Sequence, residues 1–89
     1  MSSEPVTIEP ESEETVEDSL RAQREATGLT ALDIAARADC PVEVVLRSEF
    51  GISVPVDRGL RGRLAVAYGL SADAYLRLAL DAAEAAAER

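Results

Sequence analysis

Apolar residues recur every three or four positions through most of this chain, and the runs are interrupted at glycine, proline and aspartate. This spacing is typical of amphipathic helices packed around a shared core. Residues 52–56 (ISVPV) break the pattern and are predicted to form a loop, because Pro55 disfavours helix at Val54. The predicted helices lie between Thr15 and Gly28, over 30–38, over 41–50, over 58–68, and from Ser71 into the alanine-rich end.

Local signals mark where these helices begin and end. Thr15 with Asp18, and Thr30 with Asp33, have the spacing of capping boxes. The last helix ends in LDAAEAAAER, a stretch that we expect to fray. The remaining signals are N-cap side chains at Asp57 and Ser71, a turn residue at Asp39, a first-turn proline at Pro41, and glycine stops at Gly28, Gly51 and Gly69.

Composition agrees with one small all-α domain. The chain has 89 residues, 47% of them apolar, and alanine and leucine greatly outnumber its three aromatic residues. A single cysteine excludes an internal disulfide and favours the cytoplasm, and no apolar run predicts a signal peptide or a membrane span. With no histidine, no metal-ligand cluster and no nucleophile–base pair, we expect neither an enzyme nor a metal or other cofactor.

The net charge of −8 is concentrated at the start of the chain. Residues 1–19 hold seven carboxylates and no basic residue, whereas residues 20–70 hold seven arginines and six carboxylates. Residues 1–13 have the composition of a disordered acidic tail. Two interpretations of this tail stay open: it is a solubilising leader, or it imitates a phosphate backbone and screens the arginines of the domain.

Two stretches carry a family resemblance: GLTALDIAARADCPVEVVLRSEFG (28–51) and LAVAYGLSADAYL (64–76). In their order and spacing they resemble the phage-repressor (lambda-repressor-like, Cro/Xre) helix-turn-helix family. The resemblance implies a five-helix domain over residues 14–89, with the helix-turn-helix motif at about 30–50. It also implies an ion pair between Arg24 and Glu49, and Arg24 lies on the inward face of the first predicted helix.

The resemblance implies a DNA-binding transcriptional regulator that binds double-stranded DNA at an operator as a dimer. The side chains expected to face the major groove are Val42, Glu43, Leu46 and Arg47, beside Pro41. Phosphate contacts are expected from Thr30 at the amino end of the second helix, Arg47, Arg58 and Arg61, with Arg63 as a further candidate.

The chain departs from the family in ways that favour an alternative. Only Arg47 is a good ligand on the recognition helix, and Ala31 replaces a phosphate-clamping polar residue. The alternative is a helix-turn-helix domain that binds a protein partner through its Pro41–Phe50 face, with little DNA binding. The last helix either dimerises through an apolar stripe or completes the core of the monomer. The stripe consists of Tyr75, Leu76, Ala79, Leu80, Ala83 and Ala87.

Overall fold

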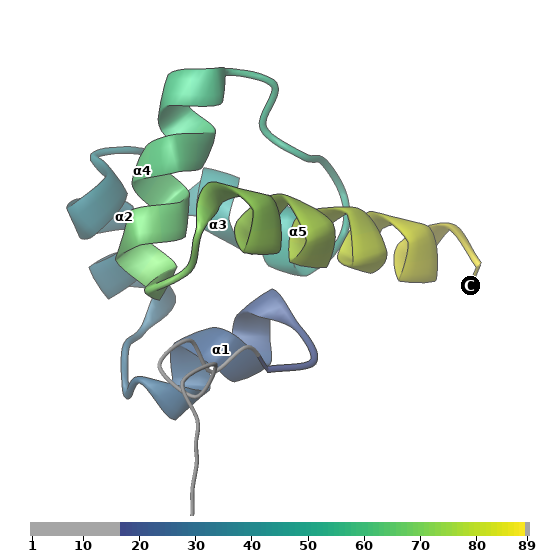
Figure 1. The fold of residues 1–89 in the computed structure, drawn as a ribbon, viewed down its shortest axis with the longest axis horizontal. Helices are drawn as coiled ribbons and strands as arrows, with labels where there is room; N and C mark the ends of the chain where they lie inside the picture. Colours follow the sequence, from purple (N-terminus) through teal and green to yellow (C-terminus); the bar gives the residue numbers. More distant parts are fainter. Residues whose placement is uncertain (1–16, 89) are drawn as a thin grey trace, which may run out of the picture.

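Residues 17–88, the part of the chain that this computed structural model describes, contain five α-helices joined by short connections (Figure 1). The predicted all-α class and the number of helices are confirmed for these residues. The predicted tail, residues 1–13, lies outside them. The helices are α1 (Leu20–Ala26), α2 (Ala31–Ala38), α3 (Val42–Glu49), α4 (Arg58–Tyr68) and α5 (Ala72–Ala87).

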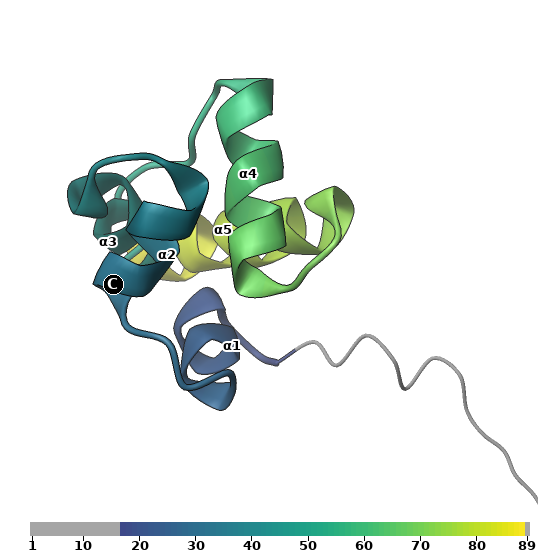
Figure 2. The same ribbon diagram turned by 90° about the vertical axis from the view of Figure 1, so that its left-hand side faces the viewer.

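The helices α4 and α5 form the centre of the packing. The helix α4 packs against α2 and α5, and α3 packs against α2 and α5 from another side. Figures 1 and 2 show α4 standing across α5, with α1 lying below both. The helix α1 contacts α3, α4 and α5, so the first helix closes the lower side of the core.

The core combines aliphatic side chains with two tyrosines. Tyr68 of α4 and Tyr75 of α5 are buried, and their ring centroids lie 5.8 Å apart. Ser48 is also buried, and its hydroxyl donates to the Val44 carbonyl at 2.9 Å. Because that hydroxyl has a partner, its burial is tolerated. The largest fully buried apolar side chains besides the tyrosines are Leu20, Ile34, Leu64 and Val45.

Most of the predicted helix boundaries are confirmed. Thr30 and Asp33 form the complete capping box of α2, and Asp39 ends this helix in the left-handed conformation at φ 57°. The side chains of Asp57 and Ser71 cap α4 and α5 by accepting from backbone N–H groups. These side chains satisfy donors that a helix leaves unpaired in its first turn.

The predicted start of α1 is wrong. The helix begins at Leu20, and its N-cap is Ser19, whose Oγ accepts from the Ala22 amide at 3.1 Å. The amide of Glu17 donates to Gln23 Oε1 at 3.0 Å, so the backbone there is held by a side chain and not by a helical carbonyl. Thr15, the first residue of the predicted capping box, lies outside the described residues.

The alanine-rich end of α5 is helical through Ala87, which differs from the predicted fraying. Gly51, directly after α3, lies so close to α5 that a Cβ there would overlap the Ala82 carbonyl and come within 2.9 Å of Ala86 Cβ. This close backbone contact holds the second half of α5 against the end of α3. The short alanine side chains permit the contact, and alanine also has the highest helix propensity.

Two glycines with the same backbone conformation test this contact. Gly28 and Gly51 both have φ +77°, but a Cβ on Gly28 would meet nothing within 4 Å. We expect Gly28→Ala to cost about 1–2 kcal/mol for the left-handed conformation alone. Gly51→Ala should cost about 1–3 kcal/mol more, because α3 and α5 must separate. Urea denaturation followed by circular dichroism measures both, and equal losses would contradict the close packing.

Candidate functional site

One face of α3 points away from the core and does not pack against it. Val45 and Ser48 are buried, whereas Glu43, Leu46 and Arg47 are exposed. Helical periodicity explains the division, since residues three or four apart share a face. The structure therefore brings together three of the four residues expected to face a DNA groove. The fourth, Val42, is half-buried and packs against the core.

The turn before α3 fixes where this face begins. Asp39 adopts the left-handed conformation, and the Cys40 amide donates to the Ala35 carbonyl at 3.0 Å. Cys40 is half-buried against the core, and burial raises the pKa of its thiol. A raised pKa keeps the thiol protonated at neutral pH, so Cys40 is a packing residue of the turn.

A carboxylate caps the amino end of α2. Thr30 Oγ1 accepts from the Asp33 amide at 3.1 Å, and Asp33 Oδ2 accepts from the Thr30 amide at 2.9 Å. The hydrogen bond from the Thr30 backbone is the main cause that lowers the pKa of Asp33. A negative group therefore lies where a phosphate was expected to bind. The Asp33 carboxylate repels a phosphate at the predicted Thr30 site, and this repulsion was not part of the prediction.

Two of the expected phosphate ligands are engaged inside the domain. Arg61 Nη1 donates to the Pro55 carbonyl at 3.2 Å and to the Val56 carbonyl at 3.5 Å. Arg63 Nε donates to the Ala38 carbonyl at 2.8 Å. Arg61 therefore connects the 52–57 loop to α4, and Arg63 connects the end of α2 to α4. Both arginines have a structural role.

Arg47 and Arg58 differ from these two arginines. Both are exposed, and neither side chain makes a hydrogen bond or ion pair with other residues in the described range 17–88. They lie on different elements, Arg47 on α3 and Arg58 in the first turn of α4. They are the expected ligands that remain available to an external anion.

The stripe predicted on α5 divides between the core and the surface. Tyr75 and Ala79 are buried, so they complete the core of the monomer. Leu80 is 52% exposed, and Ala87 is also exposed. Leu76 and Ala83 are half-buried, so the outward part of the stripe is narrower than predicted.

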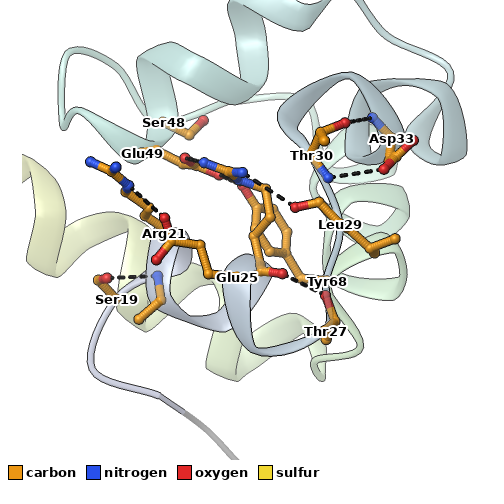
Figure 3. A network of polar contacts seen from close by, with 12 residues as sticks. Ser19, Arg21, Glu25, Thr27, Leu29, Thr30, Asp33, Ser48, Glu49 and Tyr68 are labelled. Carbon is orange, nitrogen blue, oxygen red and sulfur yellow. Dashed lines mark hydrogen bonds and ion pairs between the residues drawn. The ribbon is translucent and has the colours of Figure 1, made fainter.

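A buried charge network lies beneath the α3 face. Arg24 Nε donates to Glu49 Oε2 at 2.7 Å, and Arg24 Nη2 donates to Glu49 Oε1 at 2.9 Å, so the predicted ion pair is present and bidentate. The Tyr68 hydroxyl donates to Glu49 Oε2 at 2.6 Å, and Arg24 Nη1 reaches the Leu29 carbonyl at 3.3 Å. Figure 3 shows Glu49, Tyr68 and Leu29 brought together from separate parts of the chain.

The network is shielded from solvent. The Glu49 side chain is 4% exposed and that of Arg24 is 15% exposed. Burial, followed by the hydrogen bond to Glu49, raises the pKa of Tyr68 well above its usual range. The hydrogen bond with Glu49 raises the pKa of Arg24. Tyr68 was not among the residues predicted for this network, although a tyrosine on a buried helix face needs a partner for its hydroxyl.

Within residues 17–88 no cluster of three or more histidine, cysteine, aspartate or glutamate side chains could hold a metal ion. Over the same residues no helix is long and apolar enough to cross a membrane. No protein-family model, no curated protein and no solved structure matches the chain. Its function is therefore argued from its own residues.

The two ion pairs of α1 allow a matched test of burial. We expect Glu49→Ala to destabilise the domain by about 3–5 kcal/mol, because it leaves the Arg24 charge buried without a partner. Glu25→Ala removes the exposed Arg21–Glu25 pair, whose side chains are 65% and 56% exposed, and should cost about 0–1 kcal/mol. Urea denaturation compares the two variants, and similar losses would mean that the Arg24–Glu49 pair contributes no more than a surface pair.

The raised pKa of Tyr68 predicts a loss of stability in alkali. The unfolded chain releases the tyrosine proton near pH 10, whereas the folded chain retains it. The contribution of this group is therefore complete below about pH 10 and is lost as the pH rises further. Tyr68→Phe should cost about 1 kcal/mol at pH 7 through the lost hydrogen bond and should make the alkaline decline shallower. Thermal melts from pH 7 to pH 11 measure both effects, and an unchanged decline would refute this assignment.

Proposed function

We propose that this chain is a DNA-binding transcriptional regulator of the Xre/Cro helix-turn-helix type, which reads an operator with α3. The observation that carries the proposal is the presentation of α3. Its carboxyl end is fixed to α1 and α4 through Glu49, while Glu43 and Arg47 on its outer face are exposed. A recognition helix needs such a rigid support, because base edges are read by hydrogen bonds of fixed geometry.

Few positive charges support this contact, and that limits its strength. Across residues 17–88 there are twelve carboxylates and eight arginines, and only Arg47 and Arg58 of the expected phosphate ligands are free. If each neutralises one phosphate, the logarithm of the binding constant should fall with that of salt at a slope of about −2 per protomer. Such weak binding favours a dimer, in which two copies of α3 meet half-sites about 34 Å apart. The exposed Leu80 and Ala87 of α5 are the surface that we assign to this dimer.

A second candidate function rests on the apolar part of the same face. Phe50 is 58% exposed and Leu46 is 37% exposed, which is unusual for a surface that must contact phosphates and base edges. Asp33 at the amino end of α2 and Glu43 on α3 add negative charge around it. These features favour binding of a protein partner on the Pro41–Phe50 face, with little or no DNA binding.

A fluorescence-anisotropy titration of a random duplex-DNA pool, at low and at physiological salt, tests the first function. The wild-type chain should bind in a salt-dependent way and enrich a palindromic sequence. Arg47→Ala should weaken binding to the enriched sequence about tenfold or more. Arg77→Ala, an exposed arginine of α5, is the matched control and should have little effect.

The outcomes separate the two functions. If the wild-type chain does not bind DNA even at low salt, the regulator proposal fails and the protein-docking function takes its place. In that case Phe50→Ser should abolish capture of a partner by the immobilised chain. Val66→Ser, a control on α4 where the side chain is 77% exposed, should leave capture unchanged.

A further inference from the structure

A groove lies between α1, the end of α3 and the second half of α5, separate from the outer positions Glu43 and Arg47. Its volume is about 550 Å³, which is within the range of sites that hold a peptide or a small ligand. Apolar side chains from α3 and α5 face it, and α1 supplies polar ones. The lining includes Ser19, Arg21, Leu46, Phe50, Ala82 and Ala85.

Within residues 17–88, the apolar side chains that line this groove are only partly covered by other side chains. Phe50 is 58% exposed and Leu46 is 37% exposed, although both lie beside the alanines of α5. Arg21 on the α1 side is exposed and pairs with Glu25 of the same helix at 3.0 Å. An exposed pair one helical turn apart stabilises little, so Arg21 is available to another carboxylate.

We propose that the N-terminal segment of the same chain, residues 1–16, occupies this groove. In this arrangement Val6 and Ile8 pack against Leu46 and Phe50, and carboxylates of the segment face Arg21. The proposal does not rest on DNA binding by α3. The groove shares Leu46 and Phe50 with the Pro41–Phe50 face, so the segment would compete with a protein partner for these two side chains.

The position where the described chain begins supports this occupant. Glu17 is fixed by the hydrogen bond of its amide to Gln23, and Ser19, two residues later, lines the groove. The segment is therefore joined to the domain within three residues of a residue that lines the groove. Glu17 is nine positions after Ile8, and an extended chain of that length spans up to about 30 Å, so the segment is long enough to reach the groove. Because the segment is tethered there, its effective concentration is far above that of a free peptide.

The chemistry of the segment matches the groove. It contains five carboxylates and no basic residue, and one of these carboxylates can pair with Arg21, the exposed basic residue of the lining. Within Val6-Thr7-Ile8-Glu9, the two aliphatic side chains alternate with polar ones. In an extended conformation Val6 and Ile8 point to the same side, which is the arrangement that an apolar groove accepts.

Nitroxide labelling of the full chain tests the proposal. A spin label on Ser3→Cys, in a Cys40→Ser background, should remove most of the amide signal intensity of Phe50, Ala82 and Ala85. The amides of Leu32 and Val66 on α2 and α4 serve as internal references and should keep their intensity. Adding Val6→Ser and Ile8→Ser should restore the groove signals, whereas the matched control Thr7→Ser should not.

Two further results would overturn the proposal. If the groove signals are also lost in a mixture of isotope-labelled chains without a spin label and spin-labelled chains without isotope, the occupant is the segment of a second copy. If no signal is lost in either sample, the segment does not bind there. A second test needs no cysteine change. It compares the amide chemical shifts of the wild-type chain with those of the Val6→Ser, Ile8→Ser chain. We expect shifts at Leu46 and Phe50 and none at Leu32.

Discussion

The carboxylate of Glu49 is the group on which the arrangement of the helices depends. It accepts two hydrogen bonds from Arg24 and one from Tyr68, so a single side chain connects α3 with α1 and α4. A charge that is 4% exposed would be strongly unfavourable without partners, and here three donors compensate it. Arg24 also donates to the Leu29 carbonyl, which extends the connection to the turn before α2. Any relative movement of these helices would break several charge-assisted hydrogen bonds together.

Because of this constraint, the inner side of α3 supports the fold and the outer side does not. Val45 and Ser48 face the core, and Glu49 anchors the carboxyl end, so the orientation of the helix is determined from its inner side. The exposed positions Glu43 and Arg47 carry no part of that support. Substitutions there can change recognition with little effect on stability, which is the property that an adaptable binding surface requires.

Local signals in the sequence predicted much of the fold, and tertiary contacts account for what it did not predict. Thr30 with Asp33, Asp39 and Ser71 act within a few residues of themselves, so their capping and turn roles are readable from spacing. Ser19 replaces the expected start because Gln23, bonded to the Tyr68 carbonyl across the fold, also holds the Glu17 amide. In the same way, the candidate site lost Arg61 as a free ligand because of carbonyls that no helical pattern places near it.

The use of arginine within the domain explains why few of the expected phosphate ligands remain free. All nine basic residues are arginines, and a guanidinium can donate to several acceptors at once. Arg24, Arg61 and Arg63 each donate to a backbone carbonyl at a helix end or in a loop, where such groups lack a helical partner. Each arginine used in this way stabilises a connection between elements, and its guanidinium is engaged within the domain. Of the arginines expected to bind phosphate, Arg47 and Arg58 remain free, so recognition by α3 and the first turn of α4 depends on these two together with shape and apolar contact.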